Sequence, residues 1–204
     1  MRSFTVIYVP GLFDRTRALL ALQRAALRLW RPWGARVDFF VVGWADDAEY
    51  EDRLDSLIAR VDAHRSQGRE VVLVGASAGA SAVLGAFAHR REDVVGVAVI
   101  CGKIHRPHII PGPVLDINEV FEEALEAIDD HVESLTAGDL ARVLSLRAVG
   151  DAIVPPEDTI IPGAVNRRMT IVGHISGIAW ALLVHGERIM RFFRGLPTRP
   201  SPAR

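Results

Sequence analysis

A serine lies between two glycines at the point where an apolar strand pattern meets a helix of small residues. The segment Gly75-Ala76-Ser77-Ala78-Gly79 follows the apolar run Val71 to Val74 and precedes the helical pattern Ala80 to Ala88. A G-x-S-x-G sequence in this context is typical of a nucleophile elbow, in which a strained turn exposes the serine hydroxyl. The start of a helix also favours a developing negative charge, because its amide N–H groups are unpaired. Ser77 is therefore the candidate nucleophile.

A serine nucleophile needs a general base and an acid that orients the base. Asp151 comes just after the strand pattern Leu144 to Val149, and His174 comes just after the next one, Arg168 to Val172. Groups that follow parallel strands gather at one edge of the sheet, so we expect both side chains to meet Ser77 there. The chain order Ser, Asp, His is also the order that a nucleophile elbow predicts.

Six further histidines compete for the role of the base. Four of them fall within predicted helices, where packing or a place near a helix end is the simpler interpretation. These four are His64, His89, His131 and His185. The other two, His105 and His108, form an H-x-x-H pattern without a matching carboxylate, so no metal site is expected there. The predicted chemistry needs neither a metal nor an organic cofactor.

Stabilising an oxyanion requires backbone N–H donors beside the attacked carbonyl. The amide of Ala78, directly after the serine, is one candidate. The amide of Leu12 is the other, because Gly11 permits a sharp turn after the first strand pattern. Candidates for substrate contact lie in the loops that follow strands and in a proline-rich rim. They are Phe13, Trp44, Lys103, Ile104 and Ile109, although packing in the core is the simpler interpretation of Trp44.

The elements that must position these residues alternate between short apolar runs and helical patterns. The strand patterns are Thr5 to Val9, Arg36 to Val42, Glu70 to Val74, Val94 to Ile100, Leu144 to Val149 and Arg168 to Val172. The other helical patterns are Arg15 to Trp30, Tyr50 to His64, Ile117 to Leu135 and Gly177 to Phe193. This alternation predicts an α/β fold, a single-domain three-layer sandwich around a mostly parallel sheet of about six strands.

The composition agrees with one folded domain. The chain has 204 residues, of which 50% are hydrophobic, and about 150 residues per domain is the usual size. Its 24 cationic and 25 anionic side chains give a net charge of −1, which excludes a strongly basic protein that coats nucleic acid. The single cysteine, Cys101, is interpreted as a small buried hydrophobe. Signal-peptide features and a run of roughly 20 apolar residues are lacking, so we expect a cytoplasmic protein without a membrane span.

We expect the folded domain to cover residues 1–195 and a flexible tail to cover 196–204. Residues 103–138 combine the proline-rich rim with a helix that has one acidic face, and are predicted to form a minimal lid. Acidic faces on amphipathic helices are usually solvated, so this face is given no function. The rival to an enzyme is a non-catalytic protein that binds a partner through this face.

These residues resemble the α/β-hydrolase family. The resemblance rests on the elbow 75–79, the acid loop Gly150-Asp151-Ala152-Ile153-Val154-Pro155, the pair Gly173-His174 and the loop Pro10-Gly11-Leu12, and it covers residues 4 to about 193. It implies a minimal, nearly capless α/β-hydrolase fold without the two N-terminal antiparallel strands. It also implies nucleophile, acid and base roles for the three residues singled out above. Pro10 stands where many members have histidine.

The expected function is that of a serine hydrolase, similar to carboxylesterases and lipases, that cleaves an ester or related acyl compound through an acyl-enzyme. A thioesterase, an acyltransferase or an amidase could use the same residues. The expected partner is a small-molecule acyl substrate rather than nucleic acid or a membrane, and both a monomer and a homodimer remain open. The chain is expected to be too short for a sizeable cap. Because caps and rim loops determine which substrate is bound, the sequence does not identify the acyl group or the leaving group.

Overall fold

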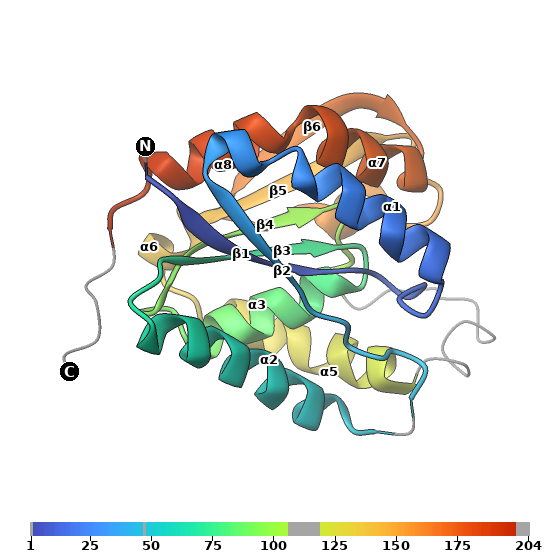
Figure 1. Cartoon of the computed structure of the whole chain (residues 1–204). Coiled ribbons are helices and arrows are strands. Elements are labelled where there is room, and N and C mark those ends of the chain that lie inside the picture. The colour runs from blue at the N-terminus through green and yellow to red at the C-terminus, as the bar shows by residue number, and fades with distance from the viewer. Residues whose placement is uncertain (1, 47, 106–118, 199–204) are drawn as a thin grey trace.

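One parallel sheet forms the centre of the molecule in a computed structural model that describes residues 2–46, 48–105 and 119–198. The strand order is β2-β1-β3-β4-β5-β6, and every neighbouring pair is parallel (Figure 1). The strands are β1 (Phe4–Val9), β2 (Ala35–Phe39), β3 (Val71–Ala76), β4 (Val94–Ile100), β5 (Val143–Val149) and β6 (Val165–Val172). The predicted number of strands is confirmed, and the sheet is parallel throughout.

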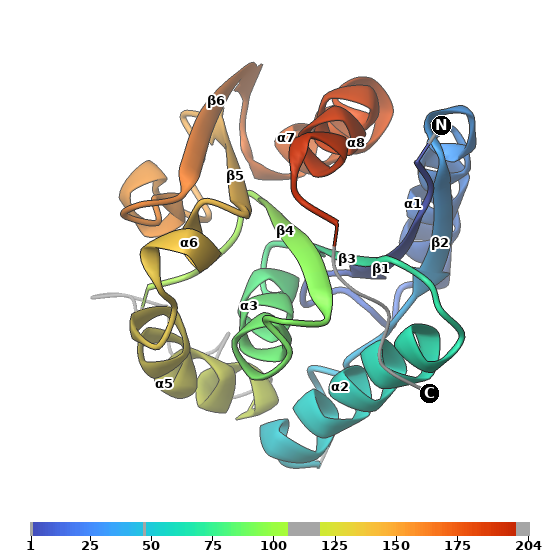
Figure 2. The same cartoon turned by 90° about the vertical axis from the view of Figure 1, so that its left-hand side faces the viewer.

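Helices cover both faces of the sheet, which confirms the predicted three layers (Figures 1 and 2). One face carries α1 (Arg17–Arg28), α7 (His174–Val184) and α8 (Gly186–Gly195), and the other carries α2 (Tyr50–Ser66), α3 (Gly79–His89) and α5 (Glu119–Glu133). The connections include the short α6 (Ala137–Leu140) and the 3-10 turns η1 (Arg31–Trp33) and η2 (Pro156–Thr159). None of the described helices has the length and apolar character needed to cross a membrane.

The register of the sheet brings the ends of distant segments together. Val9 at the end of β1 pairs with Gly75 of β3, so the loop after β1 runs beside the serine turn. Val149 at the end of β5 pairs with Val172 at the end of β6. Every residue of β1, β3 and β4 is buried, as expected for strands covered on both faces. The sheet therefore presents the segments that follow these strands on one rigid edge.

The prediction of a single last helix from Gly177 to Phe193 is wrong, because the structure contains two helices that meet at His185. The α7 helix already begins at His174 and ends at Val184, and α8 begins at Gly186. The indole Nε1 of Trp30 donates to the carbonyl of Leu182 at 2.7 Å, the carbonyl that a continuous helix would pair with the amide of Gly186. A β-carbon at Gly186 would lie 2.4 Å from that Nε1. Trp30 thus occupies the junction and separates the two helices.

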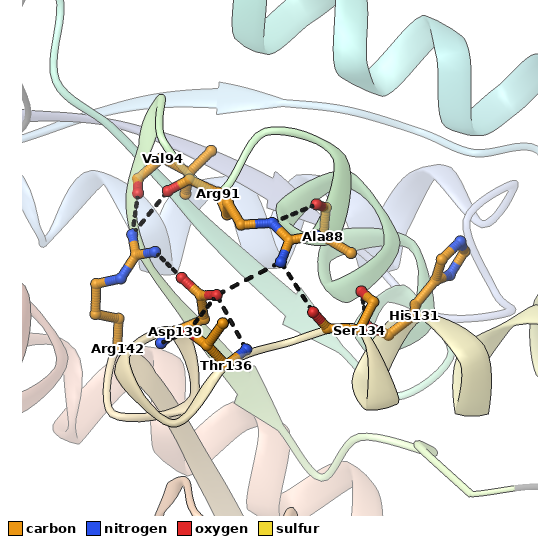
Figure 3. A network of polar contacts seen from close by, with 8 residues as sticks. All are labelled: Ala88, Arg91, Val94, His131, Ser134, Thr136, Asp139 and Arg142. Atoms are coloured by element: carbon orange, nitrogen blue, oxygen red, sulfur yellow. Dashed lines mark hydrogen bonds and ion pairs between the residues drawn. The ribbon is translucent and has the colours of Figure 1, made fainter.

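A buried ion pair anchors the connection between α5 and β5 (Figure 3). Arg142, 4% exposed, pairs with Asp139 and donates to the carbonyls of Val94 and Arg91 at 2.7 and 2.9 Å. Asp139 also forms a capping box with Thr136 at the start of α6. These bonds hold the segment before β5 against the chain that leads into β4.

The predicted lid and the predicted tail are only partly described. The α5 helix packs its buried stripe against α3, on the sheet face opposite α1 and α7, while residues 106–118, which contain most of the rim loop, lie outside the described residues. One member of its acidic face, Glu123, accepts from the amide of Tyr50 at the start of α2. Arg2 donates to the carbonyls of Leu196 and Pro197, so the first residues of the predicted tail are bound to the N-terminal segment.

Candidate active site

Ser77 lies in a strained turn between β3 and α3. Its φ angle is 53°, a value that residues with side chains seldom adopt. Its amide donates to the carbonyl of Ile100 at 3.0 Å, which ties the turn to the end of β4. Two close contacts explain the flanking glycines: a β-carbon at Gly75 would lie 2.4 Å from the Gly79 carbonyl oxygen, and one at Gly79 would lie 2.3 Å from the Val9 carbonyl oxygen. Only glycine fits at these two positions, so the local sequence creates the turn that presents the serine.

The structure brings Ser77, His174 and Asp151 together in one line of hydrogen bonds. The distance from Ser77 Oγ to His174 Nε2 is 2.9 Å, and that from His174 Nδ1 to Asp151 Oδ2 is 2.8 Å. A carboxylate can only accept, so Nδ1–H donates to Asp151, and Nε2 is left to accept from the serine hydroxyl. This arrangement can remove the proton of the hydroxyl when Ser77 Oγ attacks an electrophile.

Both partners of the serine are held in place by their own turns. His174 is the first residue of α7 and follows Gly173, whose φ of 91° directs the chain from β6 into the helix. Asp151 uses Oδ1 to accept from the amides of Ile153 and Val154 at 3.0 and 2.9 Å. Since Oδ1 is bound to the loop, Oδ2 is directed at the imidazole. Asp151 and His174 are 7% and 8% exposed, so bulk water weakens neither bond.

Both predicted amide donors belong to segments that touch the serine. Ala78 follows Ser77 directly and lies at the N-cap position of α3. The loop that contains Leu12 crosses the serine turn, because a β-carbon at Gly11 would lie 2.8 Å from Ser77 Cβ and 3.2 Å from the Ala76 carbonyl oxygen. Leu12 and Ser77 line the same pocket.

Cys101 is a neighbour of Asp151 and His174 that sequence reasoning missed. It is fully buried, has a φ of 48°, and offers Sγ within 4.8 Å of ligand atoms of Asp151 and His174. Burial, with a further contribution from Asp151, raises the pKa of its thiol to about 12. Three such groups could ligate a metal, but here the thiol remains protonated at neutral pH and both Asp151 oxygens accept hydrogen bonds. The sequence contained a sign of this position, because Cys101 directly follows β4, just as Asp151 follows β5 and His174 follows β6.

A pocket of about 370 Å³ opens beside Ser77 and His174, between α1 and α7. Apart from Ser77, His174 and Gln23, the described residues that line it have apolar side chains or none. Phe13, one of the candidates for substrate contact, lines this pocket and is 68% exposed. Sequence reasoning missed the contribution of α7, although its pattern contains a signal. The helix is apolar on nearly every side, which is not typical of a helix that faces water.

Most of the other predicted substrate contacts lie elsewhere. Trp44 and Ile104 are fully buried in the core on the α2, α3 and α5 side, where the Trp44 ring packs against Phe121. Lys103 is 5% exposed and forms an ion pair with Asp158. These three residues do not line the pocket, because Trp44 and Ile104 pack on the opposite face of the sheet and the Lys103 ammonium is held by Asp158. Ile109 lies outside the described residues.

The fold is that of the α/β-hydrolases. No family model and no curated protein matches the chain. Among solved structures it is similar to a metagenome-derived lipolytic enzyme of the pair LipS and LipT, with a TM-score of 0.66, 13% identity, and coverage of 95% of this chain and 94% of that one. It is also similar to the monoacylglycerol lipase of Paleococcus ferrophilus, with a TM-score of 0.61, 14% identity, and coverage of 95% of this chain and 96% of that one. For Est1E from Butyrivibrio proteoclasticus the TM-score is 0.66 and the identity 16%, with coverage of 95% of this chain and 88% of that one. At these identities the likeness is one of fold.

Proposed function

We propose that this protein is a serine hydrolase that cleaves a carboxylic ester or a related acyl compound of small size. The observation that carries the proposal is the hydrogen-bonded line Ser77–His174–Asp151, with the serine at a positive φ in a turn between strand and helix. The fold supports it, since the solved structures named above include a lipolytic enzyme and a monoacylglycerol lipase, which are matched over 94% and 96% of their length.

In the proposed reaction, Ser77 Oγ attacks the carbonyl carbon while His174 Nε2 takes the hydroxyl proton. Asp151 stabilises the imidazolium through the bond to Nδ1. The amides of Leu12 and Ala78 donate to the oxyanion. Collapse of the tetrahedral intermediate breaks the bond to the leaving group, which receives the proton from His174. Water then repeats the sequence on the acyl-enzyme and regenerates the serine.

The same residues could cleave a thioester or an amide, or transfer the acyl group to another acceptor, so the leaving group and the acceptor have to be identified by experiment. Ester, thioester and amide forms of one acyl group, assayed with one enzyme preparation, separate a carboxylesterase from a thioesterase and an amidase. Product analysis with added alcohols identifies an acyltransferase. We expect the ester to be cleaved with the highest kcat/KM.

The test of the class uses p-nitrophenyl butyrate and a fluorophosphonate probe. Wild-type protein is expected to hydrolyse the ester and to be labelled, whereas Ser77→Ala loses labelling and on the order of 10⁴-fold or more in kcat. Ser66→Ala is the matched control, because its exposed hydroxyl donates to the Ala63 carbonyl within its own helix, α2. Equal activity and labelling in wild type and Ser77→Ala would disprove the proposal. Failure of labelling together with capture of a partner through the α5 face would favour a binding protein.

A further inference from the structure

The pocket is a groove that follows two helices away from the serine. The α1 and α7 helices lie side by side (Figure 1), and both begin at the sheet edge where Ser77 lies. The residues that line the pocket continue along α1 as far as Leu29, just after its last turn. Along α7 they continue from His174 to Leu183. A substituent of the carbonyl carbon attacked by Ser77 can therefore extend between the two helices.

The side chains along this groove present apolar surface to solvent. Leu22 and Ile175 are 65% and 64% exposed, and Leu29 and Leu183 are 52% and 51% exposed. Apolar surface gathered in this way is favourable to cover, and a hydrocarbon chain covers it without leaving polar groups unpaired. A polar or charged acyl group would find few partners here, because Gln23 is the single polar side chain that α1 adds to the described lining.

The groove has a defined far end. Trp30 is fully buried directly after Leu29, and its indole N–H donates to the Leu182 carbonyl at 2.7 Å. This bond joins the end of α1 to the end of α7. Gly186 packs against the same indole. The two helices are thus held together at the end remote from Ser77, which limits the length of a chain that lies between them.

The length of α7 along the groove gives the size of the chain that fits. Along α7, the lining residue Leu182 lies eight residues after His174, which is about 12 Å of helix. An extended chain advances about 1.2 Å per bond, since three backbone bonds span up to about 3.6 Å, so about ten bonds fit.

We propose that the α1–α7 groove binds the acyl chain of the substrate and selects an unbranched hydrocarbon chain of about ten carbon atoms. The inference rests on the proposed hydrolase function and adds the substrate class to it. Each methylene buried in the groove raises kcat/KM about fourfold until the chain reaches Leu29 and Leu182. Beyond that length the gain stops, because additional carbon atoms remain in water or meet the end held by Trp30.

The test is a series of p-nitrophenyl esters with straight acyl chains from two to sixteen carbon atoms. Wild type is expected to show a rise in kcat/KM up to about ten carbon atoms and no rise beyond it. Ala179→Phe places a large side chain in the groove and is expected to move the optimum to shorter chains. Ala21→Phe is the control, since Ala21 is exposed on α1 and does not line the pocket. It is expected to keep the wild-type profile. Ala179→Leu repeats the test with a smaller side chain if the phenylalanine variant fails to fold.

Failure of this inference can be distinguished from failure of the hydrolase proposal. Two outcomes overturn the groove assignment but not the hydrolase proposal. One is hydrolysis whose kcat/KM stays flat or falls with chain length. The other is the same chain-length profile in wild type and in a folded Ala179 variant. Binding of decanoate to Ser77→Ala, measured by calorimetry against butyrate, does not depend on turnover. Decanoate is expected to bind more tightly by at least tenfold. Equal or undetectable binding of both overturns the groove assignment, and absence of any ester hydrolysis by wild type overturns the hydrolase proposal.

Discussion

A β-carbon placed on Gly11 would lie 2.8 Å from the β-carbon of Ser77, so the loop after β1 passes directly over the serine turn. The same added atom would lie 3.2 Å from the Ala76 carbonyl oxygen. The loop and the turn can occupy these positions only when residue 11 has no side chain. This contact determines how near the amide of Leu12 can come to a carbonyl that Ser77 attacks.

Gly11→Ala is therefore expected to lower kcat more than it lowers stability. Moving the loop away from Ser77 displaces a proposed oxyanion donor, and loss of one such donor costs about 10²- to 10³-fold in kcat. The added methyl group costs about 1–3 kcal/mol of folding free energy. Ester hydrolysis and urea unfolding measure the two effects. Gly195→Ala adds a β-carbon that meets no described atom within 4 Å beyond its chain neighbours and its own helix backbone, so it should change neither quantity. An unchanged kcat in Gly11→Ala would exclude this role of the loop.

Asp151→Asn is expected to reduce kcat about 10⁴-fold with little loss of stability. The amide oxygen of asparagine can still accept from Ile153 and Val154, so the loop is retained, but its NH₂ group cannot accept from His174 Nδ1–H. The imidazole then loses the tautomer that accepts from Ser77. Steady-state kinetics and thermal unfolding give the two quantities. The comparison variant is Asp129→Asn on the exposed face of α5, and equal turnover in the two variants would contradict the role of Asp151.

Asp139 is expected to make stability dependent on acid pH. Burial opposes its ionisation, but hydrogen bonds from Thr136 and Arg142 outweigh burial and lower the pKa of the carboxyl. A pKa that is lower in the folded state stabilises the fold above the unfolded value, about 3.9, and this stabilisation is lost as the pH falls through the folded value. Asp139→Asn should reduce the free energy of unfolding at pH 7 by roughly 3 kcal/mol, because buried Arg142 loses its counter-charge.

Urea unfolding between pH 7 and pH 2.5 measures the difference in the free energy of unfolding between wild type and Asp139→Asn. This difference should shrink once the pH falls below about 4. Asp55→Asn is the control, because Asp55 is exposed on α2. It shows how much the free energy of unfolding changes when one surface carboxylate is removed. A difference between wild type and Asp139→Asn that stays constant over the whole range would contradict the assignment.

The thiol of Cys101 is expected to be unreactive in the folded protein. Its pKa of about 12 and its complete burial leave almost no accessible thiolate at pH 8. Ellman's reagent should therefore modify the protein only in denaturant, and ester hydrolysis should survive treatment of the native enzyme. Rapid modification of native protein, with loss of turnover, would show instead that the region around the triad opens to solvent.

Trp30→Phe is expected to weaken the far end of the groove. The substitution removes the donor of the Leu182 carbonyl, and a buried acceptor left unpaired costs about 1–3 kcal/mol. The melting temperature should fall, and esters longer than ten carbon atoms should gain in kcat/KM relative to shorter ones. Trp180→Phe, on the exposed side of α7, is the control. A stable Trp30→Phe protein with an unchanged chain-length profile would exclude Trp30 as the limit of the groove.

The strands and the meeting of Ser77, Asp151 and His174 were predictable because each depends on neighbours in sequence. Gly75 and Gly79 mark a tight turn where a strand enters a helix. Asp151 follows the end of β5, and His174 follows the end of the edge strand β6. Parallel strands then bring these positions to one edge. The last helix was predicted wrongly because its interruption comes from Trp30, more than 150 residues away in the chain.

The sequence by itself determined the order of strands and helices, the serine turn and the residues that meet there, since short-range patterns and the geometry of a parallel sheet are sufficient for these. Only the tertiary structure decided where a substrate could lie. Trp44, Lys103 and Ile104 follow strands just as Phe13 does, yet Trp44 and Ile104 pack on the opposite face of the sheet and Lys103 pairs with Asp158. The groove exists because α1 and α7 are joined at their far ends, a contact between distant segments that no local pattern records.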